Sequence, residues 1–432
     1  MTIDKPTRDR ILKAVDDHFD AQLSFTQELV RHPSLRTEER GAQDLMFDAM
    51  QARGLDVDRW DLDAEEIAAH PGAGIIDVSY DEVSNVVGTF QPDVEAGRSL
   101  ILNGHIDVVP TGPESEWATS PWDSRIDGDW LYGRGSGDMK AGLVANLFAF
   151  DALRLAGLEP TARIHFQSVV EEECTGNGSL SALQRGYTAD AVLIPEPEED
   201  MLVRANTGVI WFTVRVAGSP THPREMASGF NAIDAAHFVV GQLRELEERW
   251  NADKGEHRYF EDLDHPINFN LGIIEGGDWA SSVPAWCELH MRAALYPGVT
   301  AEDAWEQILE QLGQLTTDEA GHPIRATATR NGFFAQGYVL EPGSAAEQAL
   351  SVAHQEVFGE ELQSFTTPGY LDGRVFMQYA GIPSLVYGPI SEAIHGYDER
   401  VSIASVRRIT KSIALFIAEW CGVRDTRSAP QQ

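Results

Sequence analysis

Three glutamates stand side by side in the stretch SVVEEEC at 168–174, directly after a run of apolar residues. Neighbouring carboxylates repel one another, and a bound cation is a simple group that offsets this repulsion inside a folded protein. Other side chains of the metal-binding type also follow apolar runs. They are His105 and Asp107 after 99–104, Glu196 after 190–194, His395 after 384–387, and Asp138 in the Gly-rich segment 133–142.

The chemistry available to such a group is that of two divalent metal ions. In an open parallel sheet, ligands bind beyond the carboxyl ends of the strands, where these side chains fall. A carboxylate can bridge two cations, and an imidazole nitrogen suits zinc. Two metals about 3.5–4 Å apart polarise a carbonyl and lower the pKa of a bound water to about 7. A glutamate that binds no metal can then act as the general base.

Each residue on its own has an ordinary alternative. A single histidine at a strand end is more often structural or solvated than a ligand, and a run of glutamates is usually a surface feature. The Gly-rich GRGSG at 133–137 resembles a phosphate-binding loop only weakly, because no Gly-Lys-Ser or Gly-Lys-Thr follows it. A metal hydrolase is favoured because five residues able to bind a metal all follow predicted strands. We also expect Asp107 to accept the second ring N–H of His105 and so to fix its tautomer.

The elements that must position these residues alternate between strands and helices. Strand patterns cover 83–90, 99–110, 162–173, 190–199 and 384–389, and helical patterns cover 7–31, 41–53, 139–157, 345–358 and 402–421. This alternation predicts an α/β fold with a mostly parallel sheet covered by helices on both faces. The segment 54–82 shows no clear pattern and is expected to be a loop.

The middle of the chain has a different pattern. Antiparallel strands are expected at 209–218, 269–277 and 285–295, with helices at 231–250 and after residue 300. Strands with two helices on one side predict an α+β module inserted into the first domain. The expected division is therefore 1–206 and 333–432 for the α/β domain, with 207–332 as the inserted domain.

Composition excludes several functional classes. The 432 residues carry a formal net charge of −35, which repels nucleic acid phosphates and anionic membranes. No apolar run approaches the roughly 20 residues that a membrane span needs. The N-terminus is charged and lacks the apolar segment of a signal peptide, so we expect a cytoplasmic protein. Three cysteines far apart are too few for a disulfide framework.

Together, the motifs resemble those of a known family, the two-zinc deacylases and peptidases that include acetylornithine deacetylase, succinyl-diaminopimelate desuccinylase, aminoacylase and carboxypeptidase G. They occur in the family's order over almost the whole chain, as GHIDVVP at 104–110, DGDWLYGRGSGDMKAG at 127–142, EEECTGNGS at 171–179, IPEP at 194–197 and HGYDERV at 395–401. The resemblance implies a zinc-exopeptidase-like fold with an inserted lid and dimerisation domain.

The resemblance also implies a role for each residue at the site. Two Zn²⁺ ions, or Co²⁺ or Mn²⁺ in their place, would be held by two pairs of ligands and one bridging carboxylate, namely His105 with Glu196, Glu173 with His395, and Asp138 between them. Glu172 would be the general base, and Asp107 would orient His105. The family often has a cis peptide after the bridging aspartate, so the Asp138–Met139 bond is expected to be cis.

On the substrate side, the resemblance rests on GSPTHPREMASGFNAI at 218–233. It implies that His222 reaches into the active site of a partner subunit in a homodimer and helps to hold the oxyanion. Arg292 is implied to bind a substrate carboxylate. Arg374 and Ser282 are implied as further substrate-binding residues. Ser282 stands where the family usually has an asparagine, and this departure leaves the identity of the substrate open.

The expected activity is removal of an acyl group from a small N-acyl amino acid or a similar amide, with acetylornithine as the favoured type. A formylaminopyrimidine deformylase, a dipeptidase or an aryl-amine hydrolase would use the same chemistry. A non-catalytic binding protein would lack the base or a ligand. A phosphoesterase would need clustered cations, for which Arg134 and Lys140 are candidates. Trp117, Trp122 and Trp279 are candidates for lining the cleft, with packing in the core as the alternative.

Overall fold

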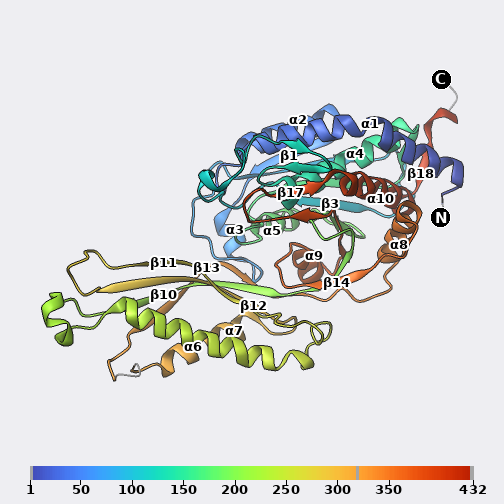
Figure 1. Ribbon diagram of the computed structural model, residues 1–432. Helices are drawn as coiled ribbons and strands as arrows, with labels where there is room; N and C mark the ends of the chain where they lie inside the picture. Colours follow the sequence, from blue (N-terminus) through green and yellow to red (C-terminus); the bar gives the residue numbers. More distant parts are fainter. Residues whose placement is uncertain (1–2, 318–320, 429–432) are drawn as a thin grey trace.

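A six-stranded sheet forms the centre of the larger part of the molecule in the computed structural model, which describes residues 3–317 and 321–428 (Figure 1). In spatial order, its strands are β1 (Asp56–Asp61), β2 (Ser84–Phe90), β7 (Ile164–Val169), β3 (Leu100–His105), β8 (Val192–Ile194) and β15 (Ser384–Val386). The four strands from β7 to β15 run parallel, whereas β2 is antiparallel to both β7 and β1. The predicted mostly parallel α/β sheet is confirmed.

Helices cover both faces of this sheet. Along β3, Gly104 faces one side, where an added Cβ would lie 3.1 Å from Leu143 of α4, and Asn103 faces the other side, where it donates a hydrogen bond to Ser179 of α5 at 3.0 Å. The first face carries α4 (Ala141–Leu155) and α10 (Ile403–Cys421), and the second carries α5 (Asn177–Gln184) and α9 (Gly373–Ala380). Three further helices are α1 (Lys5–Arg31) and α8 (Ala345–Phe358), which pack on α10, and α2 (Arg40–Ala52), which packs on β2.

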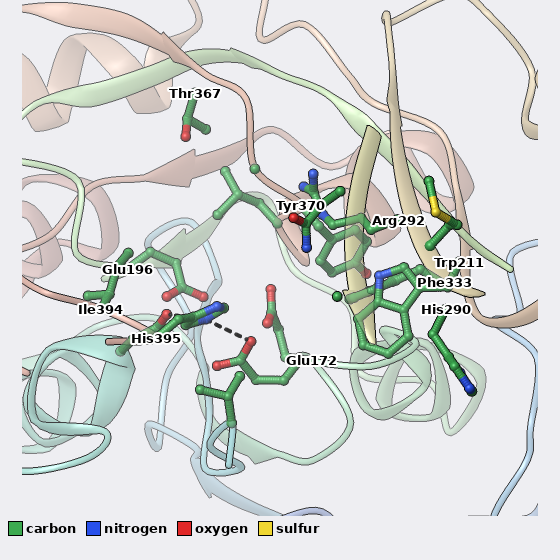
Figure 2. Close-up of a pocket in the computed structure, with 18 of the residues that line it drawn as sticks. Glu172, Glu196, Trp211, His290, Arg292, Phe333, Thr367, Tyr370, Ile394 and His395 are labelled. Carbon is green, nitrogen blue, oxygen red and sulfur yellow. Dashed lines mark ion pairs between the residues drawn. The ribbon is translucent and has the colours of Figure 1, made fainter. Parts of the chain in front are cut away.

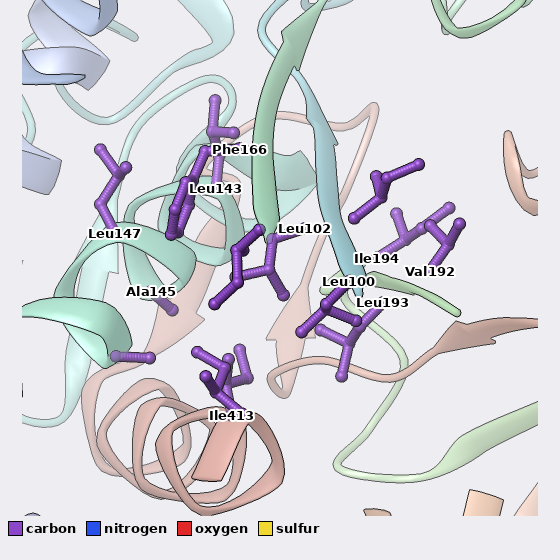
Figure 3. Close-up of a cluster of buried hydrophobic side chains, with 14 of the residues drawn as sticks. Leu100, Leu102, Leu143, Ala145, Leu147, Phe166, Val192, Leu193, Ile194 and Ile413 are labelled. Carbon is purple, nitrogen blue, oxygen red and sulfur yellow. The ribbon is translucent and has the colours of Figure 1, made fainter. Parts of the chain in front are cut away.

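The core of the larger part lies between β3, β7, β8 and the helices α4 and α10 (Figure 3). Leu102, Leu147, Phe166 and Ile413 are at most 1 % exposed there. Each such side chain stabilises the fold by about 1.5–3 kcal/mol when it leaves water. The carboxyl ends of these strands are therefore held firmly in place by the packing behind them.

A second sheet is built from one continuous stretch of chain and lies to one side of the first (Figure 1). Its order is β11, β12, β10, β13, and every neighbouring pair is antiparallel. The strands are β10 (Gly208–Ala217), β11 (Phe269–Gly276), β12 (Trp286–Leu295) and β13 (Ala326–Ala335), with α6 (Ala232–Ala252) and α7 (Ala301–Gln314) on one face. We call residues 208–335 the lid. The sequence did not predict β13, which runs past the expected boundary at 332.

The lid has a hydrophobic core of its own between its sheet and its two helices. Along β10, Phe212 and Val214 are fully buried in this core, while Trp211 and Thr213 point to the opposite face of the sheet. Asn231, from the predicted family motif, begins α6 by accepting a hydrogen bond from the backbone N–H of Ile233 at 2.9 Å. One face of the lid sheet is thus left for other contacts.

The two links between the lid and the larger part run side by side. An added Cβ at Gly208 would lie 2.6 Å from the backbone nitrogen of Gly337, and one at Gly337 would lie 2.3 Å from the carbonyl oxygen of Asn206. Only glycine allows two backbones to approach this closely. The chain therefore enters and leaves the lid at one place.

Short elements complete the fold. They are η2 (Ser136–Lys140), the pair β9 (Leu202–Asn206) and β14 (Ser364–Thr367), the pair β6 (Leu158–Pro160) and β18 (Val423–Asp425), and a sheet of β16 (Ser391–Glu392), β17 (Arg400–Ser402), β5 (Trp130–Tyr132) and β4 (Ile126–Asp127). The expectation of a loop over 54–82 was wrong, because β1 and α3 (Ala64–Ala68) lie there. The polar sequence DVDRWD suits an edge strand, which periodic apolar patterns do not reveal. Across residues 3–317 and 321–428, no helix has the length and apolar character needed to cross a membrane.

Candidate metal centre

The six residues predicted to form the metal site and its base gather at one rim of the larger sheet, beyond the carboxyl ends of its parallel strands. His105 is the last residue of β3, and Glu196 follows the end of β8. The remaining four lie on short segments next to these strands, with Glu172 and Glu173 after β7, Asp138 in η2 before α4, and His395 after β16. The peptide bond between Asp138 and Met139 is cis, as predicted.

Asp138 lies between two pairs of side chains. Its Oδ1 lies 3.0 Å from Nε2 of His105, which in turn lies 3.6 Å from Oε1 of Glu196. Its Oδ2 lies 3.3 Å from Nε2 of His395, which lies 3.2 Å from Oε2 of Glu173. Each oxygen of one carboxylate therefore faces a different histidine–glutamate pair. Figure 2 shows Glu196 and His395 on the same side of the cavity.

The donor atoms fit a pair of divalent cations. One potential ligand atom from each of His105, Asp138 and Glu173 lies within 4.8 Å of the others. Within the described residues, Oε1 of Glu196 is buried and has no hydrogen-bond partner. A buried carboxylate oxygen without a partner is costly, and a cation would satisfy it. Imidazole and carboxylate donors suit zinc, and cobalt and manganese also accept them.

Without a cation, these groups perturb one another strongly. Burial raises the pKa of Glu196 to about 7. The Glu173 carboxylate raises the pKa of His395 to about 11. Burial alone would raise the pKa of Asp138, but hydrogen bonds from His105 and His395 hold it far below its usual value. Cations held by these residues would favour the ionised carboxylates and the neutral imidazoles over these mutual contacts.

Glu172 stands apart from the two pairs. Its Oε2 lies 3.9 Å from Nε2 of His105, and the side chain lines the cavity (Figure 2). Burial raises the pKa of Glu172 well above its usual value. A carboxyl group at the edge of the cluster, with its proton affinity raised, suits proton transfer to and from a substrate.

The first glutamate of the EEE run has an ordinary partner. Glu171 is fully buried, and its carboxylate accepts hydrogen bonds from Arg36, from the Tyr80 hydroxyl at 2.9 Å and from the Thr175 hydroxyl at 2.9 Å. Its φ of 65° is left-handed, which turns the chain sharply after β7. The three carboxylates thus point in different directions, and only the second and third face the cavity.

The predicted contact between Asp107 and His105 is present, but the backbone carbonyl of Asp107 makes it and not the carboxylate. Nδ1 of His105 lies 2.9 Å from the backbone carbonyl oxygen of Asp107 and 3.7 Å from its carboxylate. The carboxylate instead accepts hydrogen bonds from the backbone N–H groups of Glu173 at 3.1 Å and Glu172 at 3.3 Å. Two backbone donors compete successfully for the carboxylate, and the carbonyl remains for the ring. Asp107 therefore contacts both the histidine and the glutamate turn.

The cluster opens into a cavity of about 600 Å³ between the rim and the lid. The lid supplies a row of four side chains, one from each strand, in the order Asn270, Arg292, Trp211 and Asn331. These residues are paired across the sheet, so they share the face that carries no helices. Figure 2 shows Trp211 and Arg292 across the cavity from Glu196 and His395.

Aromatic rings form one wall of this cavity, and sequence analysis did not identify them. The rings of Trp211 and Phe333 lie 5.2 Å apart, and those of Phe333 and Tyr370 lie 4.3 Å apart. The alternation in VIWFTVRV places Trp211 opposite the buried positions of its strand, and this signal was available. The tryptophans that were proposed do not line the cavity, since Trp117 packs against Arg134 and Trp279 is 73 % exposed. Trp122 is also absent from the cavity wall.

The predicted substrate-binding residues separate in the structure. Arg292 lines the cavity, and burial lowers its pKa. Arg374 does not line it, because the guanidinium is buried below Tyr370 and donates a hydrogen bond to the carbonyl oxygen of Gly72 at 2.8 Å. Ser282 lies in a separate pocket of the lid that Trp279 also lines.

His222 lies near Ser282 and away from the rim of its own chain. It is exposed, at the start of η3 (Pro223–Ser228), and its ring accepts a hydrogen bond from the backbone N–H of Arg224 at 3.2 Å. Thr221, next to it, accepts a hydrogen bond from the N–H of Val283 at 2.9 Å. We call this end of the lid, residues 219–231 and 277–284, the lid tip. It is the end of the lid away from the larger sheet (Figure 1).

The cations expected of a phosphate site have other partners. Arg134 forms a buried ion pair with Glu399, and the Lys140 ammonium donates hydrogen bonds to the carbonyl oxygens of Leu29 and His32. Neither side chain lines the cavity. Cys174 is a free thiol whose pKa is raised by burial, which disfavours the thiolate that binds metals.

Comparisons with known proteins bear on the family and the fold. A profile of Peptidase family M20/M25/M40 matches residues 101–419. N-formyl-4-amino-5-aminomethyl-2-methylpyrimidine deformylase of Halalkalibacterium halodurans is 29 % identical over 96 % of this chain and 98 % of its own. Acetylornithine deacetylase of Yersinia pestis is 30 % identical over 76 % of this chain and 80 % of its own. The structure of the dipeptidase Dug1p from Saccharomyces cerevisiae has the same fold, with a TM-score of 0.79, 16 % identity and coverage of 98 % of this chain and 99 % of that chain.

Proposed function

The chain belongs to Peptidase family M20/M25/M40, whose relatives hydrolyse amide bonds, and from this premise we propose that it removes a small acyl group, formyl above all, from an amine carried by a flat aromatic ring. The observation that carries this proposal is the aromatic wall of Trp211, Phe333 and Tyr370 in the cavity beside Glu172. The metal ligands, the homodimer and the role of the lid as an inserted domain, expected at 207–332 and here given the bounds 208–335, are parts of the same proposal.

The aromatic wall supports a planar substrate because stacked rings attract one another beyond the area that they bury. Two acidic side chains line the same cavity, Glu198 and Asp77, and although Asp77 is paired with Arg36 at 2.8 Å, each has oxygen atoms that can accept N–H groups on such a ring. The relative that aligns over 96 % of this chain is a deformylase of an aminopyrimidine, which carries both features. Ring stacking and N–H acceptance together describe the amine half of the substrate.

The acyl half of the substrate would lie against the metal cluster. Bound at His105, Asp138, Glu173, Glu196 and His395, two divalent cations would supply Lewis acidity to the amide carbonyl and to water. Ionised Glu172 would take the proton of the attacking water and then deliver it to the nitrogen of the leaving amine. Its place at the edge of the cluster, 3.9 Å from His105, supports this transfer.

His222 would act on a neighbouring copy. Its exposed position at the lid tip supports a role in trans, since the same chain's Glu172 lines a cavity that the lid tip does not border. In a homodimer, His222 of the partner subunit would donate a hydrogen bond to the oxyanion that forms when water attacks the carbonyl. Ser282 would reach the same place from the same lid tip.

A second candidate is deacylation of an N-acyl amino acid, the activity of the acetylornithine deacetylase relative. Arg292 favours it, because a planar guanidinium that lines the cavity pairs well with a carboxylate. The aminopyrimidine substrate carries no carboxylate for this group. The two candidates thus depend on different residues of the lid row.

A direct comparison of substrates tests the proposal. The zinc-loaded protein would be assayed with N-formyl-4-amino-5-aminomethyl-2-methylpyrimidine and with N-acetylornithine under the same conditions. Each substrate would leave some polar groups of the cavity without a hydrogen-bond partner, and these groups differ between the two substrates. We therefore expect kcat/KM to be at least about 100-fold higher for the pyrimidine. Faster hydrolysis of acetylornithine would favour the second candidate. Metal binding without hydrolysis of either would contradict both.

A further inference from the structure

The Gly-rich loop that resembles a phosphate-binding loop holds a carboxylate of its own chain. Oε1 of Glu399 accepts hydrogen bonds from the backbone N–H groups of Gly137 at 2.9 Å and Asp138 at 3.1 Å, and Oε2 accepts one from Gly135 at 3.0 Å. Gly135 has a φ of 77°, which turns these donors inward to form an anion-binding nest. The backbone donors that would bind a phosphate are therefore already used.

Arg134 extends this contact to two other loops. Its Nη1 donates to Oε2 of Glu399 at 2.6 Å, and its Nη2 donates to the carbonyl oxygens of Pro110 at 3.2 Å and Gly396 at 3.1 Å. Both side chains of the ion pair are about 1 % exposed. Pro110 belongs to the loop that follows His105, and Gly396 is the residue after His395. One buried ion pair thus joins the loops that carry Asp138 and His395 to the loop that follows His105.

The five proposed ligands differ in what holds them. His105 ends β3 and Glu196 follows β8, so the packed sheet fixes both. Asp138 and His395 lie on irregular backbone, and His395 has a left-handed φ of 61°. A buried ion pair gains little stability once the cost of removing both charges from water is counted. The role of the ion pair here is to hold the backbone of these loops in position.

We propose that Glu399 and Arg134 are positioning residues that set the distance between Asp138 and His395 and so shape the position of the second cation, the one assigned to His395 and Glu173. This inference rests on the two-metal part of the proposed function. The first cation, assigned to His105 and Glu196, depends mainly on the sheet and does not need the ion pair. Loss of the ion pair should therefore affect the two cations unequally.

The test is calorimetric titration of the metal-free protein with Zn²⁺, comparing Glu399→Gln with the natural chain. Glutamine keeps the size of the side chain, but it loses the charge and turns one acceptor into an amide N–H that faces backbone donors. We expect one of two binding events to weaken by about 10–100-fold, as is usual when partners of ligands are altered, and the other to stay within about 3-fold. At saturating zinc, kcat should recover while KM stays unchanged.

Glu347→Gln is the matched control. Glu347 also forms a poorly exposed ion pair with an arginine, Arg204, and accepts a hydrogen bond from the backbone N–H of Gly343 at 2.8 Å, but none of the three lines the cavity. We expect this variant to lose stability without any change in zinc binding. Arg134→Lys provides a second test variant, since lysine keeps the charge but lacks the planar fork that donates to Pro110 and Gly396.

The outcomes separate the inference from the proposed function. Two unchanged binding events in both Glu399→Gln and Arg134→Lys would overturn the inference alone. Equal weakening of both events would also overturn it, because it would indicate a general structural role. If Glu399→Gln does not fold, Arg134→Lys decides, with the same selective weakening expected at smaller size. If the natural chain itself binds no zinc, the two-metal function fails and the inference fails with it.

Discussion

The two walls of the cavity differ in how far a single chain completes them. At the rim of the larger sheet, the proposed ligands from His105 to His395 already lie within about 3–4 Å of their neighbours, and His105 and Glu196 are buried. The lid offers the row around Trp211 and Arg292, but its predicted His222 and Ser282 lie at the lid tip, outside this cavity. In the proposed function, the rim would supply the metal ligands and the base from one chain, whereas the lid would need a second copy to bring His222 to the site.

Removal of the proposed base, Glu172, should lower activity more than any other change, and it should act only through the rim of the larger sheet. Glu172→Gln keeps the shape of the side chain but cannot accept a proton. We expect kcat to fall by about 10²–10⁴-fold, while zinc content and KM stay close to those of the natural chain. The measurement is steady-state kinetics together with elemental analysis. Glu173→Gln is the matched control, because it should lose metal as well as turnover. Full activity in Glu172→Gln would contradict the mechanism.

The lid tip should matter almost as much, but from the other subunit. His222→Asn alone should lower kcat by about 10²–10³-fold, since an oxyanion donor is lost. Mixed and re-equilibrated with inactive Glu172→Gln, it should regain about a quarter of the natural activity, because half of the dimers are hybrids and each hybrid has one intact site. Assays of the mixture at several ratios measure this.

Two outcomes of the mixing experiment would change the comparison. No recovery, with a dimer present in solution, would show that His222 does not act in trans. Substantial activity of His222→Asn on its own would remove the lid tip from the chemistry. If the protein is monomeric and fully active, the rim would contain every group that the reaction needs, without a contribution from a second chain.

Within the lid row, two substitutions should separate the candidate substrates. Trp211→Leu removes a stacking surface of about 1–3 kcal/mol, so KM for the formylated pyrimidine should rise roughly 5–100-fold. Arg292→Met should leave that KM almost unchanged and should raise KM only for substrates with a carboxylate. Trp122→Leu, a tryptophan outside the cavity, is the control. The reverse pattern would favour the N-acyl amino acid.

Acid should weaken the larger sheet through a residue that the chemistry does not use. Burial, with a smaller contribution from Arg163, lowers the pKa of His165 in β7 to about 4, and Nδ1 of His165 lies 2.9 Å from the Thr89 hydroxyl. The unfolded chain takes up a proton at about pH 6.5, so stability is complete above that pH and is lost as pH falls toward 4. The loss reaches up to about 3 kcal/mol.

Urea unfolding at pH 7 and at pH 5 measures this effect. His165→Gln keeps a hydrogen-bonding side chain but cannot titrate, so its midpoint should depend less on pH than that of the natural chain. His18→Gln, at an exposed position of α1, is the matched control and should follow the natural chain. Equal pH dependence in all three proteins would place the acid sensitivity elsewhere.

Sequence reasoning succeeded where a residue is tied to a strongly patterned element. His105 and Glu196 follow continuous apolar strands, so their meeting at one rim follows from the sheet. It failed where the outcome depends on a single rotation or on how two parts face each other. Asp107 contacts His105 as expected, but through its backbone carbonyl, while its carboxylate accepts a hydrogen bond from the backbone of Glu173, and no local pattern distinguishes these two roles.

The cavity wall shows the same limit. Trp211 could be assigned to the polar face of its strand from the alternation around it, but that this face meets the rim is a property of the assembled fold. Arg374 matches a family motif, yet Tyr370 lies over it and takes its place at the cavity. A sequence motif indicates which residues belong to the site, but the packing of the fold determines which of their atoms face the cavity.

The two links run side by side at Gly208 and Gly337, so the lid is attached to the larger part at one end only. A strand rises about 3.4 Å per residue, so Trp211 lies about 10 Å along β10 from Gly208, and Ala217, two residues before the lid tip, lies about 30 Å from it. A rotation of the lid about Gly208 would carry the end of β10 roughly three times as far as Trp211. In the proposed dimer, such a rotation would therefore move His222 farther than Trp211.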